Sequence, residues 1–73
     1  PDPFWNTAAR TTISSLAQAM ARQGERDVHR FLELLSTVSL GSLHQYLRGT
    51  EAAALLDPDA EKPALSIRST AVT

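Results

Sequence analysis

The stretch SLGSLHQYLRGTEAAALLDPDAEKPALSIR, residues 39–68, decides the fold of this chain. Its first part predicts a helix that Ser39 caps and Gly49 ends. A hydroxyl side chain satisfies the free amides at a helix start, and glycine adopts the left-handed backbone that often follows a helix end. The buried row of this helix is expected to consist of Leu40, Leu43 and Leu47, with Tyr46 beside it.

The second part of the stretch predicts two further helices. Thr50 is expected to cap a short helix over residues 51–56, which is rich in Ala and Leu. Residues 57–59 form a break, because Pro58 forces the residue before it out of the helical region. A last helix is expected from about Pro63 to near the chain end. Its inward side chains are expected to be Leu65 and Val72, with Ile67 close by.

A long helix is predicted at about residues 3–23, ahead of this stretch. Asp2 is the expected N-cap, Pro3 stands at the first helical position, and Gly24 follows the helix end. Apolar residues recur every three or four positions, which places them on one helical face. That face is expected to comprise Trp5, Ala9, Ile13, Leu16 and Met20, opposite Arg10, Ser14, Gln18 and Arg22.

A further helix is predicted after Gly24, capped by Glu25 or Asp27. Its expected apolar set is Val28, Phe31, Leu32, Leu35 and Val38. Because the connections are short and no strand alternation appears, neighbouring helices should pack against one another. The sequence therefore predicts an all-α fold, a small compact bundle of about four to five short helices, as one domain over residues 1–73.

The composition limits the classes of function. Seven basic and eight acidic side chains leave a formal net charge of -1, whereas a free-standing non-specific DNA binder usually carries a basic surplus. The absence of cysteine excludes disulfides and thiolate metal sites and fits a reducing, cytosolic setting. We find no signal-peptide pattern and no apolar run long enough to span a membrane. Since the first residue is proline, we expect the chain to be a segment of a larger protein.

Catalytic motifs and dense ligand sets are missing from the sequence. The three glycines form no phosphate-binding loop, and the single lysine, Lys62, is not near a glycine cluster. His29 and Glu33 stand one helical turn apart and His44 lies in the next helix, a set that would hold zinc only by coincidence of packing. No G-x-S-x-G context places a nucleophile. We therefore expect no enzyme activity, metal or cofactor in this segment.

Arginines are the candidate contact residues. Arg22, Arg26 and Arg30 are spaced by four, but Gly24 interrupts the helix between them. They form either a solvated face with local ion pairs or a contact patch for an acidic partner or a DNA backbone. Arg48 is a fourth candidate, although its charge also suits the C-terminal end of its helix. Phe4 is the aromatic residue to examine, because it and its neighbour Trp5 point about 100° apart and one of them is expected on a partner surface.

A helix-turn-helix reading of residues 43–56 is disfavoured. Its second helix, EAAALL, carries no Arg, Asn or Gln that could read base edges. Direct base recognition by this segment is therefore not expected.

DPFWNTAAR at 2–10, LLSTVSLGSLHQYLRGTEAAALLD at 34–57 and AEKPALSIRSTAVT at 60–73 together resemble the all-alpha domain of type IV secretion coupling proteins, the TraD/TrwB-like conjugative ATPases. The resemblance covers nearly the whole chain and rests on the order and spacing of these blocks, since none is a catalytic signature. Two departures stand out. Pro63 implies a late start or a kink of the last helix, and the chain stops at Thr73 inside what looks like a continuing helix.

The resemblance implies a function that the residues alone do not. Such proteins are membrane-anchored, hexameric, RecA-like ATPases that use ATP and Mg²⁺ and link relaxosomes or effector proteins to the secretion channel. The domain would then face the cytoplasm at the bacterial inner membrane and recognise a relaxase, another relaxosome protein or an effector, with added contact to a DNA backbone. The alternatives are a purely structural spacer of the hexamer and a weak non-specific DNA-binding domain.

Overall fold

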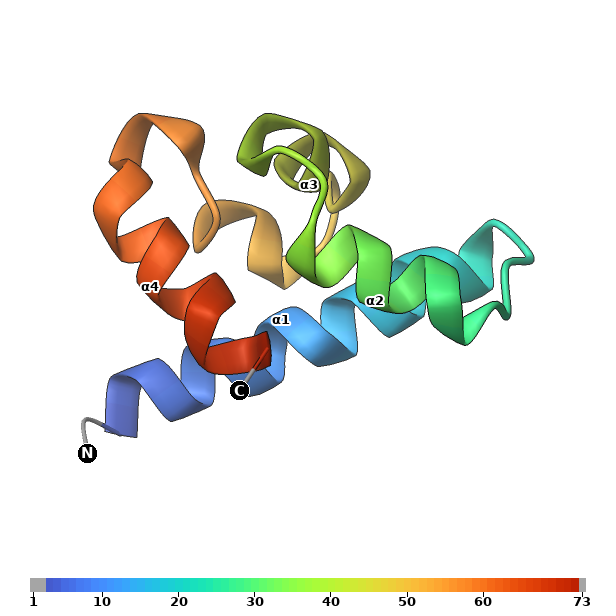
Figure 1. Ribbon diagram of the computed structural model, residues 1–73, viewed down its shortest axis with the longest axis horizontal. Coiled ribbons are helices and arrows are strands. Elements are labelled where there is room, and N and C mark those ends of the chain that lie inside the picture. Colours follow the sequence, from blue (N-terminus) through green and yellow to red (C-terminus); the bar gives the residue numbers. More distant parts are fainter. Residues whose placement is uncertain (1–2, 73) are drawn as a thin grey trace.

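The computed structural model describes residues 3–72 as a set of packed helices, with no strand in that range (Figure 1). The all-α prediction is therefore confirmed, while the predicted Asp2 cap lies outside the described residues. The elements in chain order are α1 (Pro3–Arg22), α2 (Val28–Ser36), α3 (Leu40–Tyr46), the 3-10 turns η1 (Glu51–Ala54) and η2 (Pro58–Ala60), and α4 (Glu61–Val72).

Helix α1 is the base of the structure. It runs along the lower edge in Figure 1, and α2 returns beside it in the opposite direction. The most extensive packing between elements is that of α1 against α4, and α4 also contacts α2. Turn η1 packs against α1, while α3 and η2 contact each other on the side away from α1. None of the helices within 3–72 combines the length and the apolar character needed to cross a membrane.

The turn between α1 and α2 has a defined geometry. Gly24 adopts a φ of 75°, as the sequence predicts. Its amide donates to the carbonyl of Ala21 at 3.1 Å, and the Glu25 amide donates to the carbonyl of Met20 at 2.9 Å. This pair of bonds is a Schellman motif, which satisfies carbonyls that the helix end leaves free. The chain therefore leaves α1 in a fixed direction.

Two of the predicted N-caps are confirmed. A carboxylate oxygen of Asp27 accepts a hydrogen bond from the amide two positions on, at 2.9 Å. The hydroxyl of Ser39 accepts one from the amide three positions on, at 3.2 Å. Thr50 occupies the predicted N-cap position of η1, but its side chain makes no capping hydrogen bond there. Its hydroxyl donates to the carbonyl of Leu47 at 2.6 Å and so ties off the end of α3 instead of starting η1.

Helix α4 begins two residues before the predicted start at Pro63. Asp57 accepts a hydrogen bond from the amide of Asp59 at 2.9 Å and caps η2, which leads directly into α4. Pro63 then lies in the first turn of α4, where a missing amide proton costs nothing.

Leucines from every part of the chain meet in the core. Leu16, Leu43, Leu47 and Leu56 are fully buried, so the predicted row in α3 is confirmed for two of its three members. Leu40, the third, is only half-buried. The other members of the buried cluster are Ala8, Met20, Leu34, Leu35, Ala52, Ala64 and Ile67.

The predicted buried face of α1 is confirmed for Ala9, Leu16 and Met20, but not for Ile13. Ile13 is 37% exposed, although it was expected in the core. Small side chains occupy much of the buried face, and the Thr12 hydroxyl is satisfied by donating to the carbonyl of Ala8 at 2.9 Å. Alanine, serine and threonine side chains make up the rest of the face that packs in the interior. The buried set is Ala8, Ala9, Thr12, Ser15, Leu16, Ala19 and Met20.

Helices α2 and α4 also bury faces that differ from those predicted. Both have apolar residues around more than one face, so spacing alone cannot choose among them. In α2 the expected Val28 and Leu32 are 69% and 52% exposed. In α4 the expected Leu65 and Val72 are 44% and 51% exposed. In α2 the predicted Leu35 is buried, as is Leu34, which was not in the predicted set. In α4 the buried residues are Ala64, Ile67 and Arg68.

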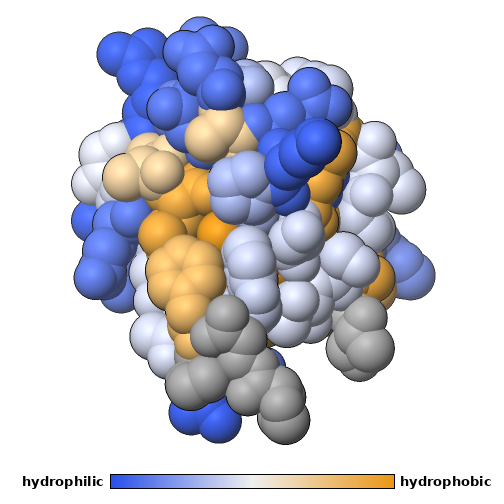
Figure 2. Space-filling model, turned by 90° about the vertical axis from the view of Figure 1, so that its left-hand side faces the viewer, coloured by the Kyte–Doolittle hydropathy of each residue, from blue (hydrophilic) through white to orange (hydrophobic). Residues whose placement is uncertain are grey.

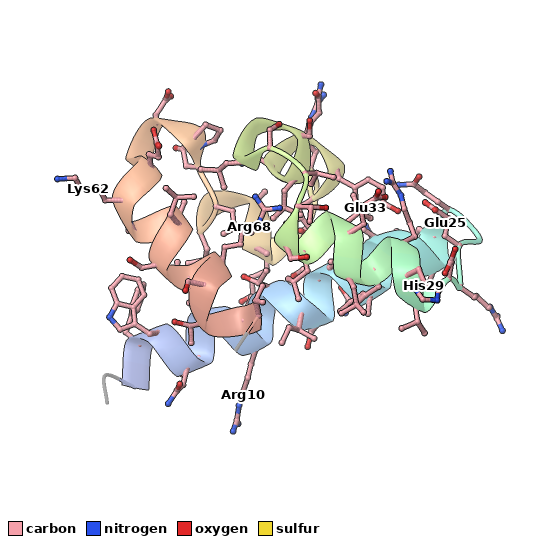
Figure 3. The ribbon with its side chains drawn as sticks, viewed as in Figure 1. Arg10, Glu25, His29, Glu33, Lys62 and Arg68 are labelled. Atoms are coloured by element: carbon pink, nitrogen blue, oxygen red, sulfur yellow. The ribbon has the colours of Figure 1, made fainter. Side chains whose placement is uncertain are left out.

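Arg68 is a buried cation that joins two helices. It is only 8% exposed, and Figure 3 shows it directed into the interior. Its Nε donates to the carbonyl of Leu35 at 2.6 Å and its Nη2 to the carbonyl of Leu34 at 3.2 Å. These carbonyls belong to the last turn of α2, where no further helical amide reaches them. Burial lowers the pKa of Arg68 from its ordinary value, and within residues 3–72 no carboxylate pairs with it.

Replacing Arg68 with alanine should destabilise the fold by about 1.5–3 kcal/mol, the usual range for a hydrogen bond to a charged group. The reason is that the Leu34 and Leu35 carbonyls would stay buried without a donor. Urea denaturation checks this, with the exposed Lys62→Ala on the same helix as the control. Equal stability of the two variants would contradict the role of Arg68.

Truncating Leu43 to alanine should cost about 2–5 kcal/mol, because the side chain is fully buried in the core. A domain of this size holds only about 3–5 kcal/mol in total, so the variant should be largely unfolded. Circular dichroism would detect the loss of helix. The exposed Val72→Ala should keep its helical signal, and a folded Leu43→Ala protein would refute the assignment.

Candidate functional site

The α1–α2 turn carries three of the four predicted contact arginines. Arg22 lies in the last turn of α1, Arg26 in the connection and Arg30 in α2. The turn is held by the Schellman motif at Gly24 and by the Asp27 cap of α2. The arginine side chains are therefore presented from a rigid backbone.

Arg30 is engaged within the domain. Its Nη1 lies 2.6 Å from Oε1 of Glu33, and its Nε lies 3.8 Å from Oε2 of Glu25. The hydrogen bond to Glu33, with both negative charges nearby, raises the pKa of Arg30. This residue follows the local ion-pair alternative, and Figure 3 shows Glu25 and Glu33 on the same end of the molecule.

Glu25 also connects the turn to α3. The hydroxyl of Tyr46 donates to its Oε1 at 2.7 Å, a contact between residues 21 positions apart. Burial, followed by this hydrogen bond, raises the pKa of Tyr46 to about 12. Sequence reasoning missed this contact, because nothing in the local pattern pairs residues so far apart.

Arg22 and Arg26 are exposed, and within residues 3–72 neither forms a side-chain hydrogen bond or ion pair. The structure thus separates the predicted set. Arg30 is neutralised locally, whereas Arg22 and Arg26 are free to contact a partner. Arg48 is likewise exposed and unpaired among the described residues, but it lies in the turn that ends α3, outside the α1–α2 connection.

An apolar groove opens beside the turn, with a volume of about 200 Å³. We call it the hairpin groove, after the α1–α2 hairpin that forms it. Sequence reasoning missed it, because Val28 was expected in the core. The one available signal was the surplus of apolar residues in α2 over what a single buried face needs. Its lining consists of Ala17, Met20, Glu25, Arg26, Asp27, Val28 and Phe31.

A second apolar area lies at the start of α1. Phe4 is 51% exposed and its ring meets that of the half-buried Trp5 edge-on, with centroids 5.0 Å apart. The expectation that one of this aromatic pair is exposed is thus correct for Phe4. Figure 2 shows apolar side chains gathered on this face, and the residues that line a cleft there include Phe4, Ala54 and Leu55.

The described residues offer no assembled site for a metal or a nucleotide phosphate. No three His, Asp or Glu side chains between residues 3 and 72 converge as metal ligands. Gly24, Gly41 and Gly49 lie in two separate turns and in α3, and Lys62 is exposed on α4. These residues do not fit a phosphate-binding loop. The features that the described surface does offer are two free arginines at the α1–α2 turn and the apolar groove beside it.

Comparison with known proteins defines the class. Residues 1–73 match the family described as type IV secretion-system coupling protein DNA-binding domain, and the chain belongs to this family. A particular relative is the coupling protein TraD of Escherichia coli (strain K12), which is 34% identical over 68 residues. The match covers 93% of this chain and 10% of TraD, so the chain spans about a tenth of the length of that relative. No solved structure matches the chain.

Replacing Tyr46 with phenylalanine should cost about 0.5–1.5 kcal/mol at neutral pH through loss of the hydrogen bond to Glu25. Because the folded-state pKa is about 12 against an ordinary value of 10.0, the contribution of Tyr46 is fully present below pH 10. It is lost as the pH rises toward 12, since the unfolded chain then releases the proton more readily.

Urea midpoints of the wild type and Tyr46→Phe at pH 7 and at pH 11 test this. The difference between the two proteins should shrink at the higher pH. As the chain has one tyrosine, its absorbance titration also reports the pKa directly. A midpoint near 10 in the folded protein would contradict the contact.

Proposed function

We propose that this chain is the substrate- and relaxosome-recognition module of a type IV secretion coupling protein. It would bind a relaxase, another relaxosome protein or a secreted effector and deliver it to the channel during conjugative DNA transfer or effector export. Family membership supplies the setting. The observation that carries the proposal is the pair of exposed, unpaired arginines, Arg22 and Arg26, on a rigid turn beside an apolar groove.

The proposal also covers the longer parent protein of which this chain would be a part. A longer parent protein would form a membrane-anchored hexamer at the cytoplasmic face of the bacterial inner membrane. Its ATP and Mg²⁺ would be held by other parts of that protein, since the glycines and Lys62 of this segment form no phosphate-binding loop. In this arrangement the helical domain would bind the protein substrate, and other parts of the parent protein would hydrolyse ATP.

Contact with a DNA backbone is the second candidate function. The family description, which names a DNA-binding domain, supports it, as do the free arginines. The charge distribution weakens it. The net charge is -1, and Figure 3 shows Arg10 and Lys62 pointing away from the molecule in different directions. A 3-10 turn of four residues, η1, also stands where a recognition helix would have to be.

A titration of the ¹⁵N-labelled chain with the relaxase, an effector and duplex DNA of its own secretion system tests the proposal. A protein partner should shift the amide signals around the α1–α2 turn. The double variant Arg22→Ala/Arg26→Ala should weaken that binding by about tenfold or more, which corresponds to about 1.4 kcal/mol. Lys62→Ala is the matched control and should bind as the wild type does.

The alternatives give different results. Affinity for DNA alone, falling steeply with added salt, would assign the domain to backbone binding. If the relaxase, the effector and the DNA all fail to bind, the remaining alternative is a structural spacer. In that case surface charges are dispensable, and only core changes such as Leu43→Ala disturb the domain.

A further inference from the structure

We infer that the hairpin groove is a docking site for a short amphipathic helix with an acidic flank, contributed by a partner protein. The inference deepens the proposed function, on which it rests, by naming the chemistry of the recognised segment. It depends on three features of the described surface: an open apolar floor, a free cation at the rim, and carboxylates that are already engaged.

The floor and walls of the groove are apolar. Met20 is buried at its base, Phe31 is half-buried, and Val28 is 69% exposed. A valine this open gains from being covered, because removing apolar area from water is worth about 25 cal/mol per Å². An apolar ligand that covers this groove would therefore gain free energy from burial of apolar area that the domain itself leaves exposed.

The apolar surface continues beyond the groove along both helices. Ile13, 37% exposed, lies one helical turn before Ala17, and Leu32, 52% exposed, lies one turn after Val28. From Ile13 to Met20, α1 advances about 10 Å at 1.5 Å per residue. This equals the span from i to i+7 in a second helix, which is the spacing of anchor residues when an amphipathic helix fills a groove.

The charged side chains at the groove favour a ligand that carries negative charge. Glu25 accepts the Tyr46 hydroxyl and lies near Arg30, and Asp27 caps α2. Both lining carboxylates are thus engaged inside the domain. Arg26 is the lining residue whose charge has no partner within residues 3–72. An incoming carboxylate would complete an ion pair there, whereas an incoming ammonium would have to displace an existing contact.

The charged residues around the turn also argue against a DNA backbone as the ligand of the groove. Around the turn, Arg22, Arg26 and Arg30 are balanced by Glu25, Asp27 and Glu33, so the formal charges cancel. DNA affinity comes from a local cationic surplus that releases counterions. Arg26 is the one of the two free arginines that lines the groove. One cation beside an apolar floor suits one carboxylate on an apolar helix better than a chain of phosphates.

Three synthetic probes test the inference on the ¹⁵N-labelled chain. The first is a helix-forming peptide of about 15 residues with Leu at i, i+3, i+4 and i+7 and Glu along one flank, a length at which isolated helices are marginally stable. The second carries Lys in place of every Glu, and the third is a duplex DNA. We expect saturable shifts at the amides of Ala17, Arg26 and Val28 with the acidic peptide, and affinity about tenfold or more above that of the Lys peptide.

Substitutions sharpen the test. Arg26→Glu should reverse the preference, so that the Lys peptide binds more tightly than the Glu peptide, whereas Lys62→Glu on the far side should leave it unchanged. Val28→Ala and Leu32→Ala should each weaken binding of the acidic peptide several-fold. Val72→Ala, at an apolar residue of α4 that is about as exposed as Leu32, should not. All these positions are on the surface, so the variants should keep the native helical signal.

The inference is overturned by an absence of saturable shifts at the groove, by a charge preference that Arg26→Glu does not alter, or by shifts at the same amides with DNA but not with the acidic peptide. Its failure is separable from that of the proposed function. A cognate relaxase or effector that binds through another face keeps the proposed function and removes the inference. If the acidic peptide fills the groove but no cognate protein binds, the inference about the groove stands and the proposed function fails.

Discussion

The interaction on which the rest of the structure depends is the one between the guanidinium of Arg68 and the carbonyls of Leu34 and Leu35. A helix end that faces the core must find donors for its last carbonyls, and α2 finds them on α4. The contact also sets the rotation of α4, which must present Arg68, and with it Ile67, to the interior. Leu65 is consequently left on the surface.

The hairpin of α1 and α2 carries the surface for which partner binding is proposed. Gly24 ends α1 with a Schellman motif and Asp27 starts α2, so the intervening residues are held at both sides. Glu25 adds a third tie through the hydroxyl of Tyr46 on α3. Since the backbone of the turn is fixed, Arg26 and the exposed Val28 keep a constant relation to each other, and a ligand need not pay to order them.

Charge pairing decides which arginines can serve recognition. Arg30 has the same spacing in sequence as Arg22 and Arg26, yet it is neutralised by Glu25 and Glu33. With this pairing, the domain has free cations at its turn without a net positive field. That combination favours short-range recognition of a protein segment over long-range attraction of nucleic acid. The family description names a DNA-binding domain, and any contact with DNA would be expected at the free arginines.

The sequence by itself determined the helical class and most helix ends, because caps such as Asp27 and Ser39 and the turn at Gly24 act through neighbouring residues. The order and spacing of its sequence blocks indicated the family. It also supplied the candidate arginines, without telling Arg26 from Arg30. Tertiary structure alone decided which face each helix buries, since α2 and α4 carry more apolar residues than one face holds. Leu34 is buried in place of Leu32, and Arg68 enters the core, because the helix packed against each position supplies contacts that spacing along the chain does not contain.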